Sequence, residues 1–345
     1  MNNIKDTDTN FWNKLSKPIF ALAPMEDVTD TVFREIVADI ASDNTLSVLM
    51  TEFANTDGLC HKVGRDVVSK RFYVNQSEKE LLKKKNIKLV AQIWGNKPEY
   101  FTEATKWINE NFDFDGIDIN FGCPVKNVVK SGCCSALIDN PSLAQEIVYA
   151  TKEATNLPVS VKTRTGVKTH QTERWIKQLL ETKPTAITLH GRTQKMQSEF
   201  PAEWSEIKKA VEVRNSILPD MPILGNGDVF TYDDALQRIK ETGVDGVMIG
   251  RGIFKNPWFF NPNINPDELS FHQKLSLLWK HATLYNQTWK DDKNFAIIRR
   301  FFKIYSSEFS GAGKLRAKLM TTKSLEDVVA LLKDFYKFKE EEYPF

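Results

Sequence analysis

The chain has 345 residues, and its 41% hydrophobic and 27% charged residues are typical of a soluble globular protein that buries a large core. No apolar stretch approaches the ~20 residues that span a bilayer, and the first residues lack the basic and apolar regions of a secretory signal. We therefore expect a cytoplasmic protein without a membrane anchor. The formal net charge of +2 neither indicates nor excludes a nucleic acid partner.

Short apolar segments bounded by turn residues recur through the first 255 residues, with helix-like segments between them. Near-continuous apolar runs are typical of parallel strands that are covered on both faces. Eight such strands alternating with helices favour an α/β fold, the (β/α)8 or TIM barrel, over a doubly wound open sheet, because no G-x-G-x-x-G follows the first strand. The predicted strands are residues 19–25, 46–53, 87–95, 116–123, 158–166, 186–193, 222–229 and 246–252.

Helical periodicity is clear in three segments between these strands. Residues 98–112 begin with a proline, which suits the first turn of a helix. A second helix is expected to open at residues 140–142. Residues 231–242 have acids in the first turn and Gly243 just after the end, which matches the preferred caps of a helix.

The pattern changes after Arg251. Residues 256–269 contain three prolines and predict a linker. Four helical segments follow and predict a small C-terminal helical bundle, at 271–289, 294–308, 314–320 and 324–338. We therefore expect a barrel domain over residues 1–258 and a helical domain over residues 259–345.

The helical region is locally basic. Between residues 293 and 323 it has eight basic side chains and one acid, Glu308. Such an excess suits a phosphate-binding face, although a solvated helix surface explains it equally well. The basic residues are Lys293, Arg299, Arg300, Lys303, Lys314, Arg316, Lys318 and Lys323.

Each predicted strand begins apolar and ends in polar residues that a hydrophobic core would exclude. In a (β/α)8 barrel the carboxyl ends of the strands form the mouth, where active sites lie. One such residue could be a satisfied structural group, but a succession of them indicates a functional mouth. They are Glu26, Glu52, Gln92, Asn120 with Cys123, Lys162 with Arg164, His190 with Arg192, Asn226 with Asp228, and Arg251.

The last two strand ends, GNGD (225–228) and IGRG (249–252), predict a phosphate site. Glycines let backbone amides approach an anion, and the loops after strands seven and eight are the usual phosphate site of this fold. Arg251 adds a cation suited to phosphate oxygens. Two tight turns without a ligand are the alternative.

The ends of strands three, five and six suit a flavin. A flavin ring needs an amide for its pyrimidine edge and a cation near N1 and O2, where negative charge grows on reduction. Gln92 fits the first role and Lys162 the second. His190 could donate to the ring or to the phosphate, although a lone histidine is more often structural.

The sequence DINFGCP (118–124) places a thiol directly after the fourth strand. With an ordinary pKa near ~8.5, the thiol of Cys123 would be mostly protonated at neutral pH and could donate a proton. A buried structural role is favoured for Cys60. The four cysteines form no C-x-x-C pair, so we expect free thiols and no metal site.

Seven segments, in this order and at similar spacing, resemble the tRNA-dihydrouridine synthase family. The resemblance covers essentially the whole barrel, and the basic helical region lies where that family carries its tRNA-binding helical domain. One departure is Cys133–Cys134, where the family typically has small residues. The segments are APMEDVTDTVFR (23–34), DINFGCPVKNV (118–128), SGCCSALI (131–138), VKTRTG (161–166), LHGRT (189–193), GNGDV (225–229) and MIGRG (248–252).

The resemblance implies reduction of the C5–C6 double bond of specific tRNA uridines, with FMN as cofactor and NADPH as reductant. It implies Cys123 as the general acid, and Asn120 and Arg164 as contacts to the target uracil. A monomer is expected. The FMN-binding residues that it implies are Pro24, Met25, Glu26, Gln92, Lys162, His190, Asn226, Gly227, Asp228, Gly250 and Arg251.

Two other functions are compatible with parts of this pattern. A flavin barrel that reduces a free pyrimidine, as dihydroorotate dehydrogenases do, explains the flavin site but leaves the basic helical region without a purpose. The second is a non-catalytic RNA-binding or chaperone protein that retains a vestigial barrel.

Overall fold

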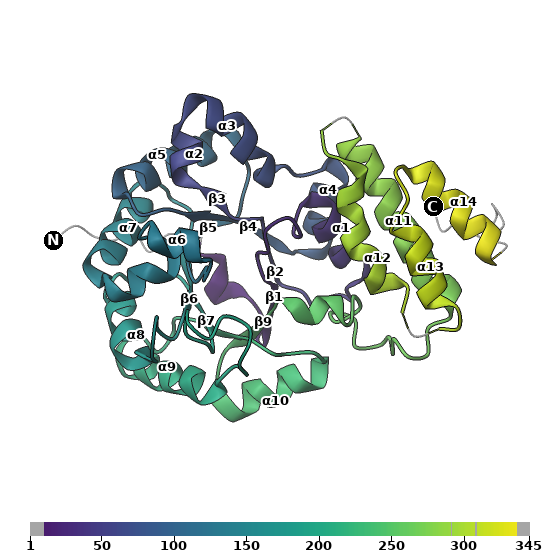
Figure 1. The fold of residues 1–345 in the computed structure, drawn as a ribbon. Helices are drawn as coiled ribbons and strands as arrows, with labels where there is room; N and C mark the ends of the chain where they lie inside the picture. Colours follow the sequence, from purple (N-terminus) through teal and green to yellow (C-terminus); the bar gives the residue numbers. More distant parts are fainter. Residues whose placement is uncertain (1–9, 291, 308, 337–345) are drawn as a thin grey trace.

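The computed structural model describes residues 10–290, 292–307 and 309–336. Eight parallel strands form a closed barrel, and helices surround it (Figure 1). The order around the barrel is β2-β1-β9-β8-β7-β6-β5-β4, and pairing of β2 with β4 closes it. The predicted (β/α)8 barrel is confirmed. Its strands are β1 (Ile19–Leu22), β2 (Val48–Met50), β4 (Lys88–Trp94), β5 (Gly116–Phe121), β6 (Val159–Arg164), β7 (Ile187–His190), β8 (Ile223–Asn226) and β9 (Gly246–Ile249).

The second predicted strand, 46–53, is divided in the structure. After β2 the chain leaves the barrel wall, and it pairs again with β4 through β3 (Ala54–Asn55). Glu52 lies in the interruption, and its carboxylate accepts a hydrogen bond from the Asp27 amide at 2.6 Å. The interruption therefore ties the second strand end to the loop that follows β1.

Close approach of β1 and β9 joins the first and last strands of the barrel. Ile19 is opposite Gly246 in the register. A Cβ atom at residue 246 would lie 1.9 Å from the Ile19 carbonyl oxygen, which is far inside van der Waals contact. Glycine is therefore required at this junction.

The helices predicted between the strands are present at the expected places. The first, expected at 98–112, is α5 (Pro98–Asn111), and the one expected to open at 140–142 is α7 (Pro141–Glu153). The third is α10 (Tyr232–Thr242), where Thr231 caps the first turn and Gly243, at φ 74°, ends the helix. The other helices around the barrel are α1 (Thr31–Ile40), α2 (Thr56–Cys60), α3 (Lys62–Val68), α4 (Gln76–Lys85), α6 (Lys126–Lys130), α8 (Thr172–Glu181) and α9 (Trp204–Ile217).

A helical bundle follows the barrel, as predicted. Residues 256–269 form turns without a long helix or strand. Helix α11 (Phe271–Trp289) has the predicted bounds, whereas the helix expected at 294–308 is a short 3-10 turn followed by α12 (Arg299–Tyr305). Glu308 and the last two residues of the helix predicted at 324–338 lie outside the described residues. The remaining helices are α13 (Ala312–Leu319) and α14 (Leu325–Tyr336).

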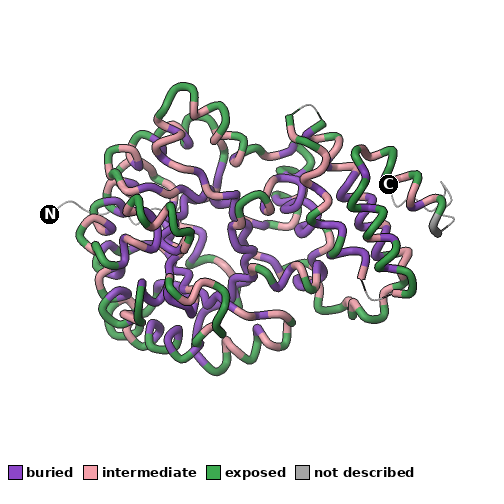
Figure 2. Tube along the Cα trace, in the orientation of Figure 1, coloured by how far each residue is buried: buried purple, intermediate pink, exposed green. Residues whose placement is uncertain are grey.

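The bundle packs on the side of the barrel that carries α1 (Figure 1). Phe33 of α1 is fully buried and stacks on Phe301 of α12, with 5.1 Å between the ring centroids. A single cluster of buried apolar side chains includes residues of both parts, and the buried trace runs through both in Figure 2. The division at residue 258 stays a prediction.

Candidate active site

A cavity of about 250 Å³ opens at the carboxyl ends of β1 and β6 to β9. Loops after these strands provide its wall, which is the place where active sites lie in this fold. Its lining includes Pro24, Met25, Lys162, Arg164, His190, Arg192, Asn226, Gly227, Asp228, Gly250 and Arg251.

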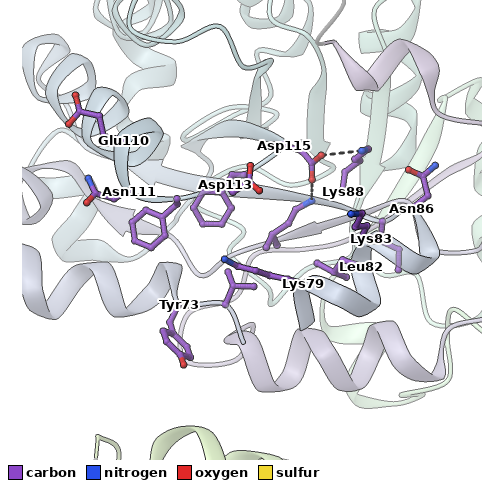
Figure 3. A pocket seen from close by; sticks show the side chains of 15 residues that line it. Tyr73, Lys79, Leu82, Lys83, Asn86, Lys88, Glu110, Asn111, Asp113 and Asp115 are labelled. Atoms are coloured by element: carbon purple, nitrogen blue, oxygen red, sulfur yellow. Dashed lines mark hydrogen bonds and ion pairs between the residues drawn. The ribbon is translucent and has the colours of Figure 1, made fainter. Parts of the chain in front are cut away.

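A larger cavity, of about 750 Å³, lies at the opposite end of the strands (Figure 3). It includes Lys88 at the start of β4 and Asp115 just before β5, which form an ion pair at 3.1 Å. The amino ends of barrel strands contribute to stability rather than to catalysis. We therefore place the candidate site at the smaller cavity, where the predicted residues meet.

Positive charge dominates the smaller cavity. The pKa of His190 is lowered well below its usual value, mainly by burial and then by the charges of Arg164 and Lys162. Burial, with Arg164 nearby, lowers the pKa of Lys162 to about 8, and burial also lowers the pKa of Arg164 to about 10. A surplus of cations in a partly desolvated cavity favours the binding of an anion.

The carboxylate of Asp228 offsets only part of this charge. It forms ion pairs with Arg192 at 2.5 Å and with Arg251 at 3.6 Å. Arg251 is still 55% exposed along its side chain and can reach a ligand. The charges of Lys162 and Arg164 are not balanced by this carboxylate.

Gly227 shapes the cavity between β8 and α10. Its φ of 121° is a conformation that other residues rarely adopt, and a Cβ atom there would lie 2.7 Å from the Ala202 Cβ atom and 2.9 Å from His190 Cδ2. Beside it, the Asn226 side chain accepts a hydrogen bond from Lys162 Nζ at 3.2 Å and donates one to the Met248 carbonyl oxygen at 2.7 Å. Asn226 thereby holds the lysine ammonium within the cavity.

Cys123 lies just after β5 and is a partly buried residue. A hydrogen bond from the Cys134 thiol lowers its pKa to about 7, against the opposing effect of burial. The ordinary thiol pKa assumed from the sequence is therefore too high, because the buried Cys134 stabilises the thiolate. At neutral pH the Cys123 sulfur is close to half protonated.

Most of the predicted FMN-binding residues line the smaller cavity. Glu26 and Gln92 do not: the Glu26 side chain is 49% exposed and pairs with Arg71 at 2.9 Å, whereas Gln92 is fully buried. The predicted cofactor set omits Arg192, which is only 2% exposed and lines the cavity. The segment LHGRT (189–193) was the available signal, because it places an arginine two residues after His190.

The two predicted uracil contacts lie on neighbouring strands. Arg164 lines the cavity, and its Nε donates to the Gly122 carbonyl oxygen at 2.7 Å, next to Cys123. Asn120 is 6% exposed, and its side-chain oxygen accepts hydrogen bonds from the amides of Gly122 and Cys123 at 2.9 and 3.0 Å. Both side chains therefore hold the loop that carries the thiol.

Within the described ranges, the structure contains no group of three or more histidine, cysteine, aspartate or glutamate side chains placed to bind a metal ion. None of the described helices has the length and apolar character required to cross a membrane.

Two kinds of sequence comparison agree on the relationship of this chain to known proteins. The sequence profile of the family described as "Dihydrouridine synthase (Dus)" matches residues 21–340. A "Probable tRNA-dihydrouridine synthase" of Staphylococcus aureus (strain COL) is 42% identical over 328 residues, which cover 94% of this chain and 95% of the relative. A "Probable tRNA-dihydrouridine synthase 2" of Bacillus subtilis (strain 168) is 40% identical over 94% of this chain and 96% of the relative.

Among solved structures, morphinone reductase superposes with a TM-score of 0.51 at 10% sequence identity, covering 72% of this chain and 86% of that chain. At this identity the likeness shows the barrel fold alone. The family profile covers nearly the whole chain, and the relatives match it at 40% identity or more over almost their full length. The chain belongs to the dihydrouridine synthase family.

Proposed function

We propose that this protein is a cytoplasmic, FMN-dependent tRNA-dihydrouridine synthase that acts as a monomer. It reduces the C5–C6 double bond of specific uridines in tRNA, with NADPH as the reductant. The observation that carries the proposal is the cationic cavity at the barrel mouth, beside a loop whose thiol has a pKa of about 7. The names of the relatives, which are 40–42% identical, support the same substrate.

The residues of the cavity fit FMN. An anionic ligand would compensate the charges of Lys162 and Arg164, and the glycines at 227 and 250 present backbone without a side chain at the cavity wall, which suits the close approach of a phosphate. At Gly250 an added Cβ atom would make only an ordinary van der Waals contact, with the Ala23 side chain at 3.8 Å. The other cavity residues that would hold FMN are Pro24, Met25, His190, Asn226, Asp228 and Arg251, and the proposed set also includes Glu26 and Gln92, which lie outside the cavity lining.

FMN, when bound, supplies the hydride that saturates the pyrimidine ring. The protein side chains supply the proton and the geometry. The Cys123 thiol, with a pKa of about 7, is matched to proton donation near neutral pH, here to C5 of uracil. Arg164 and Asn120 would orient the uracil, and the target base must leave its stack to reach the mouth.

The test is the variant Cys123→Ala. It should still bind FMN and consume NADPH, whereas dihydrouridine formation in tRNA should fall by about 10²- to 10⁴-fold, because a general acid contributes that much. Cys60→Ala is the control: burial raises the pKa of the Cys60 thiol to about 11, so we expect the parent rate. Product formation by Cys123→Ala at the parent rate would show that Cys123 is not the proton donor.

The same assay separates the competing functions. A tRNA-dihydrouridine synthase should reduce uridine within folded tRNA and leave free uracil or uridine unchanged. An enzyme for free pyrimidines would show the opposite preference. A non-catalytic RNA-binding protein would be colourless after purification and would take up no FMN.

A further inference from the structure

A buried carboxylate lies beneath the mouth, and it is not among the residues proposed to hold FMN, to contact the uracil or to donate the proton. Asp118, on β5, is fully buried. Its Oδ2 accepts a hydrogen bond from Gln92 Nε2 at 2.6 Å, and its Oδ1 accepts one from the Ser160 hydroxyl at 2.6 Å. Its hydrogen-bond partners are thus an amide and a hydroxyl rather than a cation, although burying a carboxylate in this way costs folding free energy.

The hydrogen bonds continue from Asp118 to the loop that carries Cys123. Gln92 Oε1 accepts a hydrogen bond from Asn120 Nδ2 at 2.9 Å. Asn120 Oδ1 in turn accepts the amides of Gly122 and Cys123 at 2.9 and 3.0 Å. One chain of side chains therefore leads from the carboxylate to the backbone of the thiol residue.

An ionised carboxylate only accepts hydrogen bonds and the two backbone amides only donate, so both ends of this chain require the same orientation of each side-chain amide. The carboxylate requires the NH2 group of Gln92 on its side, which leaves the Gln92 oxygen for Asn120. That oxygen requires the NH2 group of Asn120, which leaves the Asn120 oxygen for the two backbone amides. With Asp118 replaced by an apolar residue, the NH2 group of Gln92 would lose its acceptor, and only the backbone amides of Gly122 and Cys123 would still hold the chain in place.

The chain also limits what Asn120 can offer to a substrate. Both lone pairs of its oxygen are used by the amides of Gly122 and Cys123, and one of its two N–H groups is used by Gln92. A single N–H group remains. Toward a pyrimidine Asn120 is therefore a donor, and the complementary group on the base is a carbonyl oxygen.

We propose that Asp118 is a positioning residue: it anchors Gln92, which in turn anchors Asn120, the side chain that holds the loop of Cys123 and donates to a carbonyl oxygen of the pyrimidine. This inference rests on the proposed function. The environment of Asp118 is consistent with an ionised group near neutral pH, because burial raises its pKa only to about 6.

The experiment compares three single variants in the FMN-loaded enzyme with tRNA. Asp118→Leu removes the acceptor and should slow dihydrouridine formation by about 10- to 100-fold, because small misplacements of reacting groups cost that much. Asp118→Asn can still accept from Gln92 and donate to the Ser160 hydroxyl, so we expect a rate within about threefold of the parent. Ser160→Ala leaves the carboxylate in place and serves as the matched control.

A double variant tests the role of the hydrogen bonds of residue 118 without a large change in side-chain size. In Asp118→Asn with Ser160→Ala, the new amide has lost the hydroxyl that fixed its orientation. We expect the double variant to be slower than the rate obtained by multiplying the rate reductions of the two single variants, which is the sign of coupled residues. In the same variant, the pH at which alkylation of Cys123 reaches half its maximal rate should move away from about 7. A general loss of stability would not produce this shift.

The outcomes separate this inference from the proposed function. A parent enzyme that forms no dihydrouridine would reject the proposed function. A parent that forms it, with Asp118→Leu at the parent rate, would reject only the role of Asp118. Equal slowing by Asp118→Asn and Asp118→Leu, or strictly multiplicative effects in the double variant, would also overturn the role of Asp118.

Discussion

Lys162 carries its charge in a place where burial opposes it, so its protonation is sensitive to any anion in the cavity. Without a ligand its pKa is lowered from 10.5 to about 8, first by burial and then by Arg164, while Asp118 and Cys123 act in the opposite direction. The unfolded chain therefore binds more protons between about pH 8 and 10.5. In that window the ligand-free protein gains stability from Lys162 as the pH rises.

FMN binding should have the opposite pH dependence. An anion beside Lys162 raises its pKa, so binding takes up a proton above about pH 8. We expect the dissociation constant for FMN to increase above this pH by up to about tenfold per pH unit, measured by fluorescence titration of the apoprotein. Lys162→Met should bind more weakly but without this slope, and a flat profile for the parent protein would contradict the assignment.

Cys134 controls the acidity of its neighbour. It is fully buried in a left-handed conformation, φ 53°, and its thiol donates to the Cys123 sulfur. Cys134→Ala removes this donor, so the pKa of Cys123 should rise from about 7 toward its ordinary value. The midpoint of iodoacetamide alkylation at Cys123, followed by mass spectrometry, should shift upward with it.

Cys134→Ser keeps a donor at the same position and is the matched control, with a midpoint close to that of the parent protein. Cys60 serves as an internal reference, because its raised pKa of about 11 keeps it slow to react over this range. An unchanged midpoint in Cys134→Ala would mean that Cys134 does not set the acidity of Cys123.

At the scale of single elements, the contact between β1 and β9 is sensitive to one methyl group. Gly246→Ala would place a Cβ atom 1.9 Å from the Ile19 carbonyl oxygen, so the two strands must separate. We expect the free energy of unfolding to fall by about 2–3 kcal/mol, measured by urea denaturation.

Gly313→Ala is a suitable control, because nothing lies within 4 Å of the added atom. It replaces glycine by alanine within α13 and should raise the free energy of unfolding by about 0.5–1 kcal/mol. Equal effects of the two substitutions would contradict the tight junction at Gly246.

The strands were predictable because each is a short apolar run bounded by turn residues, and all eight lie inside the predicted ranges. The segment from 56 to 85 was not predicted. Its first helices, α2 and α3, have only five and seven residues, which is too short for a helical period to be visible. The break after β2 was also missed; Glu52 lies in it and accepts the Asp27 amide, a contact with a distant part of the chain that a local sequence pattern does not show.

For the site, the sequence indicated which residues reach the mouth but not how they are joined. The polar strand ends predicted Lys162 and His190 at one cavity. The chain of hydrogen bonds through Asn120 and Gln92 ends at Asp118, a partner that is buried and therefore gives no signal at a strand end. The low pKa of Cys123 likewise depends on a residue 11 positions later in the chain.

At the scale of the whole molecule, half of the predicted basic cluster stabilises the protein itself. Lys293 pairs with Asp30 at 3.6 Å, and Arg300 donates to the Asp27 carbonyl oxygen at 2.9 Å. Arg299 and Arg316 donate to carbonyl oxygens within the bundle. A count of charges along the sequence therefore overestimates the basic surface that is available to RNA.

Three lysines of this cluster are exposed and, within the described part of the chain, form no ion pair: Lys303, Lys314 and Lys323. Changing all three to glutamate should weaken tRNA binding. The slope of log affinity against log salt concentration should become shallower by about one unit for each phosphate contact that is lost. The measurement is tRNA affinity at several salt concentrations. FMN content and NADPH consumption should stay at parent levels.

The control is the same charge reversal at Lys177, Lys208 and Lys240, which are exposed on α8, α9 and α10 around the barrel. It changes the net charge equally. If both triple variants weaken tRNA binding to the same extent, the effect is one of total charge, and the bundle is not the RNA-binding surface.

The loop of residues 24–30 belongs to both halves of the molecule. Pro24 and Met25 line the cavity, whereas Asp27 and Asp30 accept contacts from Arg300, Lys293 and the indole of Trp289. A chimera that exchanges only the C-terminal region between relatives would therefore leave this loop facing the wrong partner. An exchange that preserves these contacts must therefore include two separate segments of the sequence, the bundle and the turn that follows β1.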